Sequence, residues 1–135
     1  MPHSATDGNM VENLVQFDLQ REIEDAQSKK PWPSGIHART LFKKPDFRVV
    51  LIQMEPHARM DEHHADGTLS VQVLRGNIQF QAQGESHDLR AGSLLTLGAS
   101  IKHNVEAQED SAFLLTIGWP KGAELEAMPH RGYGS

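Results

Sequence analysis

The sequence predicts an all-β domain, a sandwich or barrel of short strands, with a short helical segment before it. Three observations support this prediction. The chain has 135 residues, a length that suits one hydrophobic core. After residue 46, short apolar runs recur about every ten residues and are separated by turn-forming residues. Only residues 11–26 carry apolar side chains at a spacing close to that of a helix.

The N-terminal part is expected to form a flexible start and a strand/helix segment. Residues 1–10 are polar and are predicted to be a flexible N-terminus. Within residues 11–34 we predict a short strand near Leu14, followed by a short helix that begins at about Asp18, whose carboxylate can cap it. The sequence SKKPWPSG ends this helix because its prolines and glycine do not continue one.

The barrel itself is predicted over residues 35–119, and residues 120–135 are predicted to be a polar C-terminal tail. Residues 47–54, FRVVLIQM, are apolar on both faces, which is typical of a covered central strand. Residues 77–83, NIQFQAQ, alternate between an apolar face and a face of glutamines. Further strands are predicted at 69–74, 86–89, 90–97, 101–107 and 111–119.

Composition excludes several classes of function. The absence of cysteine removes disulfides, thiolate metal ligands and cysteine nucleophiles. The formal net charge of −5 argues against nucleic acid as a direct partner, because phosphate backbones are bound by clustered Lys and Arg. No run approaches the roughly 20 apolar residues of a membrane span, and the first residues lack the apolar core of a signal peptide. We therefore expect a cytoplasmic protein that does not enter a membrane.

Two segments, HARMDEHHADGTLSVQVLRG and GSLLTLGASIKHNVEA, follow the spacing of two known motifs. With the strand pattern, they make residues 47–119 resemble the cupin family, whose fold is a double-stranded β-helix, or jelly-roll barrel. The first cupin motif places its two histidines at His63 and Ala65, and its glutamate at Leu69. The second motif places its histidine at His103. The chain thus resembles a small single-domain cupin in which the four-ligand pattern is incomplete.

The resemblance implies a metal site inside the barrel, for which His63 and His103 are the two matching ligands. His64 is the third candidate if the turn ADGT re-aims it, since neighbours on a strand otherwise point to opposite faces. The secondary candidates are His57, Gln72 and Glu62. The metal would be one divalent ion (Fe, Mn, Zn, Ni or Cu), because the ligands offer only nitrogen and oxygen. The pocket is predicted to be lined by Leu69, Val71, Val73 and Phe80.

A second interpretation of the histidine pair stands beside the metal site. His63 and His103 can equally be interior polar residues that are hydrogen-bonded to each other, to water or to a bound small molecule. The predicted function is therefore small-molecule binding in the barrel, with or without a divalent metal. The alternatives are a metal-dependent enzyme of the oxygenase or isomerase class, and a non-catalytic sensor or structural cupin. The resemblance also implies a homodimer, and no catalytic residue can be assigned.

Overall fold

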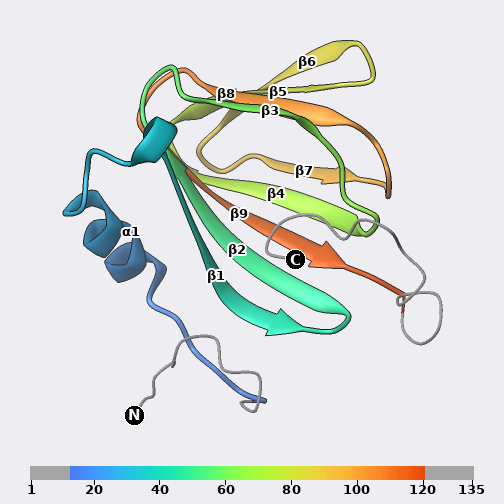
Figure 1. Ribbon diagram of the computed structural model, residues 1–135, viewed down its shortest axis with the longest axis horizontal. Coiled ribbons are helices and arrows are strands. Elements are labelled where there is room, and N and C mark those ends of the chain that lie inside the picture. The colour runs from blue at the N-terminus through green and yellow to red at the C-terminus, as the bar shows by residue number, and fades with distance from the viewer. Residues whose placement is uncertain (1–12, 121–135) are drawn as a thin grey trace.

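Two antiparallel β-sheets, one of five strands and one of four, face each other across a shared apolar core (Figure 1). The computed structural model describes residues 13–120, so the predicted flexible N-terminus and nearly all of the predicted C-terminal tail lie outside the described residues. Sheet A has the strand order β1-β2-β9-β4-β7, and sheet B has the order β3-β8-β5-β6. The nine described strands are β1 (Ile36–Lys44), β2 (Phe47–Met54), β3 (Arg59–His63), β4 (Thr68–Arg75), β5 (Asn77–Ala82), β6 (Glu85–Arg90), β7 (Leu94–Leu97), β8 (His103–Ala107) and β9 (Ser111–Gly118). The all-β prediction is confirmed.

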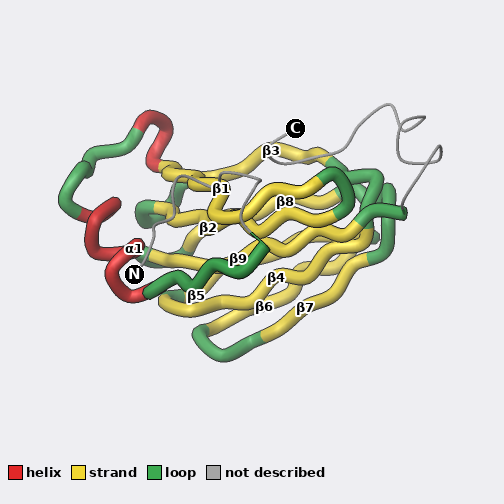
Figure 2. The backbone as a smooth tube through the Cα atoms, turned by 90° about the horizontal axis from the view of Figure 1, so that it is seen from below, coloured by secondary structure: helices red, strands yellow, loops and turns green. Residues whose placement is uncertain are grey.

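Helix α1 (Leu19–Gln27) precedes the sheets and begins where the sequence predicts. The Asp18 carboxylate accepts a hydrogen bond from the Arg21 amide at 3.2 Å, as an N-cap does. The helix buries Ile23 and Ala26 against the outer face of sheet A, and Trp32 donates from Nε1 to the Ala26 carbonyl at 3.0 Å. A single 3-10 turn, η2 (Pro33–Gly35), then leads into β1. Figure 2 shows these helical segments together at one end of the strands. Within residues 13–120 no helix is long and apolar enough to cross a membrane.

The predicted strand near Leu14 is wrong. Residues 14–18 have no regular structure, and the Leu14 side chain is 90 % exposed. The prediction came from the alternation of Val15, Phe17 and Leu19. Phe17 and Leu19 instead pack beside Ile23 in the apolar cluster between the helix and sheet A. Their spacing therefore reflects contact with a sheet face, not strand pairing.

The other predicted strands are confirmed, but the structure contains two strands that were not predicted, β1 and β3. Both are the outermost strands on one side of their sheets. In β1, a register shift between Thr40 and Phe42 breaks the alternation of buried and exposed residues. In β3, the sequence RMDEH is mostly polar and its pairing with β8 is also irregular. Edge strands pair on one side only and need fewer apolar residues, so they leave a weak pattern.

The core lies between the inner faces of the two sheets. Val71, Ile52 and Phe113 of sheet A meet Ile78 and Phe80 of sheet B, and all five side chains are buried. Strand β2 lies between β1 and β9 and is buried on both faces, as its apolar sequence predicts. The burial of this core is the main favourable term in the stability of the domain.

The chain passes from sheet A to sheet B at Gly76, the single residue between β4 and β5. Its φ of +83° lies in the left-handed region that favours glycine. A Cβ atom there would collide with the Asp110 carbonyl and the Ser111 hydroxyl. That hydroxyl accepts a hydrogen bond from the Asn77 amide at 3.0 Å, which secures the corner.

Candidate functional site

His63 and His103 lie at the same end of the barrel, and we call it the histidine end. Strand β3 ends there at His63, and the short loop 64–67 leads directly into β4. Strand β8 begins there at His103, which is the register partner of both His63 and Ala82, the last residue of β5. In sheet A, the register of Thr68 with Gly118 places the start of β4 and the end of β9 at the same end.

His63 and His103 face each other inside this end of the barrel. They are direct partners in the antiparallel pairing of β3 with β8, where side chains lie close on one face. Their ring centroids are 4.5 Å apart, with the planes inclined at 62° in an edge-to-face arrangement. The His103 ring also stacks on Phe80, at a centroid distance of 5.1 Å and an angle of 14°. His103 is only 1 % exposed, so the pair is continuous with the core.

Both imidazoles hold the same tautomer. Nδ1 of His103 lies 2.9 Å from the Ile101 carbonyl oxygen, and Nδ1 of His63 lies 2.6 Å from the Asp61 carbonyl oxygen. A carbonyl only accepts, so each Nδ1 carries a proton and donates it, and Nε2 keeps its lone pair. Burial lowers the pKa of His103, the bond to Ile101 raises it, and the nearby His63 and His64 lower it further. The His103 imidazole is therefore neutral near pH 7.

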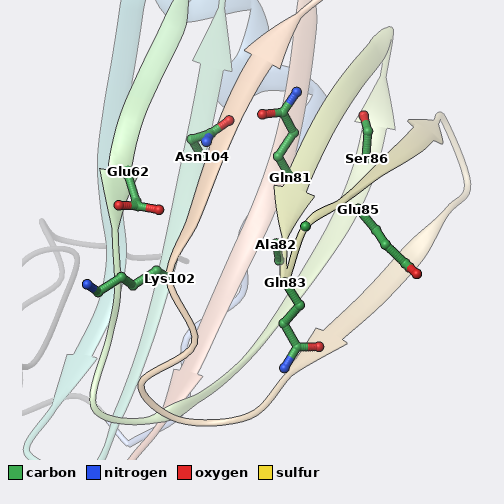
Figure 3. A pocket seen from close by; sticks show the side chains of 9 residues that line it. Glu62, Gln81, Ala82, Gln83, Glu85, Ser86, Lys102 and Asn104 are labelled. Carbon is green, nitrogen blue, oxygen red and sulfur yellow. The ribbon is translucent and has the colours of Figure 1, made fainter.

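The other candidates for metal ligation do not join this pair. His64 lies on the loop after β3, where its Nε2 is 4.0 Å from Oδ1 of Asp66. His57 is exposed and its amide donates to the Ala107 carbonyl, at the opposite end of β8 from His103. Gln72 is exposed on the outer face of sheet A, and Glu62 points to the outer face of sheet B (Figure 3). Over residues 13–120, no three His, Cys, Asp or Glu side chains are close enough to hold a metal.

The donor set thus meets part of what a metal requires. Metal-binding histidines usually donate their second ring nitrogen to a carbonyl or carboxylate, and His63 and His103 both do so. Catalytic zinc sites, however, use three protein ligands, and the structure brings together two. At the two positions where the cupin motif has further ligands, Ala65 and Leu69 are buried in the core. His64 is the nearest residue that could add a third donor.

The structure contains a cavity of about 360 Å³ at the open side of the barrel, between the β5–β6 hairpin and β7. We call it the inner cavity. Phe80, Leu95 and Leu97 supply apolar walls, and His87 and Glu85 are among its polar lining residues. Of the four predicted lining residues, Phe80 lines it, whereas Leu69, Val71 and Val73 are packed in the core. The alternation of LLTL in β7 was the available signal for the contributions of Leu95 and Leu97.

Sequence reasoning missed Arg48. Its side chain is only 2 % exposed, and its guanidinium carbon lies 5.0 Å from the centroid of the Trp119 ring. Arg48 is the register partner of Ile117 and shares its strand face with Val50, so it lies on the inner side at the histidine end. The signal was present in FRVV, where an arginine interrupts an apolar strand. It places a permanent positive charge at the same end as the two imidazoles.

Two facing antiparallel sheets, with a histidine pair at one end and a cavity at the open side, define a small barrel of the ligand-binding class. Residues 48–127 match the model of the AraC-like ligand binding domain, and the chain belongs to this family. No curated protein matches the chain by sequence.

Comparison with solved structures confirms the cupin fold. A conserved protein of unknown function from Streptococcus pyogenes is 20% identical, with a TM-score of 0.68, over 89% of this chain and 100% of that one. A cupin superfamily protein from Desulfitobacterium hafniense is 13% identical, with a TM-score of 0.63, over 67% and 84%. The cupin domain of an XRE family transcriptional regulator from Enterobacter cloacae is 20% identical, with a TM-score of 0.58, over 64% and 99%. At these identities the likeness concerns the fold alone.

Proposed function

We propose that this domain binds a small molecule in the inner cavity. The observation that carries the proposal is the cavity itself, because about 360 Å³ lies within the range of small-molecule sites. Such sites combine apolar walls with a few polar groups that orient the ligand. Phe80, Leu95 and Leu97 provide the walls, and His87 and Glu85 provide the polar groups. Membership of a ligand-binding family supports the same function.

The cavity is also connected to the histidine pair. Phe80 lines the cavity and stacks on His103, which in turn contacts His63. A ligand that packs against Phe80 therefore contacts the aromatic group that stacks on His103. We expect the ligand to have an apolar body and at least one hydrogen-bonding group.

The test uses two neighbouring leucines of β7 as a matched pair. Leu95 lines the cavity, whereas Leu94 is 64 % exposed on the opposite face of the strand. Leu95→Trp should fill the cavity and abolish ligand binding, and Leu94→Trp should leave it intact. The measurement is thermal shift against a panel of metabolites, followed by calorimetry on each hit. A panel without hits, or a ligand that binds Leu95→Trp as well as it binds the wild type, contradicts the proposal.

A second candidate function is a metal-dependent enzyme of the oxygenase or isomerase class. It is favoured by one observation, the shared orientation that leaves Nε2 of His63 and Nε2 of His103 with lone pairs. These two nitrogens would bind a divalent ion (Fe, Mn, Zn, Ni or Cu), with His64 as the third ligand, and the ion would supply Lewis-acid or redox chemistry. Element-resolved metal analysis of protein purified without a histidine tag tests this. Well below one metal per chain after reconstitution contradicts it.

We also propose that the domain acts as a homodimer that reports ligand occupancy to a partner. Helix α1 covers one part of the outer face of sheet A, at Leu41 and Leu51. Beyond the helix, Leu94 on the edge strand β7 is 64 % exposed, so a large apolar side chain remains uncovered at that edge of sheet A. Membership of the AraC-like ligand-binding family supports ligand binding as the signal that such a dimer would report. Sedimentation should show a dimer that Leu94→Asp dissociates, and a wild-type monomer at micromolar concentration contradicts the proposal.

A further inference from the structure

A second hollow lies on the outside of the barrel, on the solvent-facing side of sheet B (Figure 3). We call it the outer pocket. Its volume is about 390 Å³, and its lining side chains come from β3, β5, β6, β8 and the adjoining turns. It opens on the other face of β5 from the inner cavity, because β5 places Phe80 on the inner face and Gln81 on the outer face, and the two hollows adjoin at the β5–β6 turn, where both are lined by Ala82, Gln83 and Glu85.

The middle of the outer pocket is formed by two primary amides. Gln81 and Asn104 are direct partners in the register of β5 with β8, and their side chains project into the hollow beside each other (Figure 3). Within residues 13–120 neither side chain makes a hydrogen bond. The neighbouring outward glutamine of β5, Gln79, differs: it donates to Asp88 at 2.8 Å and accepts from Ser86 at 2.9 Å. The sheet thus satisfies one amide internally and leaves the pair in the pocket open to a ligand.

The charged groups lie around this amide pair. Glu62 and Lys102 stand on one side of the pocket, and Glu85 stands on the other (Figure 3). The two carboxylates outnumber the single ammonium of Lys102, so the lining repels an anionic ligand. None of the described residues that line the pocket is aromatic, so among them a planar ring would find no surface on which to stack. These features disfavour an anionic or aromatic ligand, and the two amides at the centre of the pocket favour a ligand that binds through hydrogen bonds.

A primary amide offers a donor and an acceptor side by side. Two adjacent hydroxyls of a polyol match it, because one donates to the amide oxygen and the other accepts from the amide nitrogen. We propose that the outer pocket binds a neutral, hydroxyl-rich small molecule of monosaccharide size, held by the side chains of Gln81 and Asn104. This site is additional to the inner cavity, because neither Gln81 nor Asn104 lines that cavity.

The test follows amide chemical shifts of isotope-labelled protein in two-dimensional NMR. Mannitol and glucose are the neutral probes, and gluconate and glucosamine are their anionic and cationic counterparts. The neutral probes should shift the signals of residues 81–86 and 102–104 with a dissociation constant of roughly 1–10 mM, as expected for a few solvent-exposed hydrogen bonds. Gln81→Ala and Asn104→Ala should each weaken binding about tenfold, since each removes two hydrogen bonds.

Gln72→Ala is the matched control, because Gln72 is an exposed amide on the outer face of the other sheet. It should bind the neutral probes as the wild type does. Binding of gluconate or glucosamine alone overturns the assigned ligand class. The absence of shifts in this region with about 50 mM of either neutral probe, well above the expected dissociation constant, overturns the site itself.

Discussion

Replacing His103 by alanine separates a packing role of this residue from a ligand role. The side chain is 1 % exposed, stacks on Phe80 at 5.1 Å and contacts the His63 ring at 4.5 Å. His103→Ala therefore leaves a void in the core and removes the aromatic contacts and the hydrogen bond to Ile101. His103→Leu also loses the aromatic contacts and the hydrogen bond to Ile101, but it keeps most of the volume and leaves no large void.

The expected magnitudes differ enough to be measured. Truncating a buried side chain to alanine costs about 2–5 kcal/mol, and we expect about 3 kcal/mol for His103→Ala. A swap that keeps the volume costs less than about 1.5 kcal/mol, and this applies to His103→Leu. His87→Ala, at a half-buried position on the edge of the inner cavity, should cost less than about 1 kcal/mol.

Urea unfolding at pH 7.5 measures these free energies. With a slope of about 1–3 kcal/mol per molar urea, the midpoint of His103→Ala should fall by roughly 1–3 M. Both His103 variants lack the Nε2 donor, so both should fail to bind a divalent metal if the histidine pair is a metal site. Equal stability of His103→Ala and the wild type would refute the packing argument. A stable His103→Leu that still binds metal would refute the ligand argument.

Three further predictions concern turns and charge. Gly76→Ala should lower the free energy of unfolding by about 3 kcal/mol or more, because the added Cβ would strike Ser111. Gly84→Ala, also at positive φ but in open space, should lower it by only about 1 kcal/mol. Equal losses in urea unfolding would contradict the geometry described for the turn at Gly76. Gln83→Asn should stabilise the β5–β6 turn by a few tenths of a kcal/mol, since positive φ at both turn residues favours Asn-Gly. Burial, and then the charges of Lys29 and Arg39, lower the pKa of His37 in the folded state. As the pH falls, the unfolded state therefore binds this proton before the folded state does, and the stability should decrease below about pH 6.5. A His37→Gln variant that shows the same decrease contradicts this prediction.

The candidate site could be predicted in part from the sequence. Motif spacing identified His63 and His103, and the structure places their rings edge to face, with centroids 4.5 Å apart. The same spacing placed Ala65 and Leu69 where a cupin metal site has ligands, and both are buried among apolar neighbours. The sequence alone therefore shows that two of the four cupin ligand positions are lost, since neither alanine nor leucine can donate to a metal.

Other features of the site depend on how distant segments meet. Glu62 was a candidate to support the histidines, but β3 turns its side chain to the outer pocket, because its neighbour His63 faces inward. His57 is near His63 in the sequence, yet the turn that contains it lies against the far end of β8. Arg48 was recognised as a residue of the histidine end only when its neighbours on the inner face of sheet A were known.

The sequence by itself determined the all-β class, the capped helix and most strands, because alternation, caps and turn residues are local signals. It also determined the composition of the site, with two histidines and without cysteine. Only the tertiary structure decided the edge strands β1 and β3, the inner cavity and the outer pocket. The physical reason is that edges and cavities arise where sheets end or separate. These positions are set by long-range pairing across the whole domain, and no short stretch of sequence encodes them.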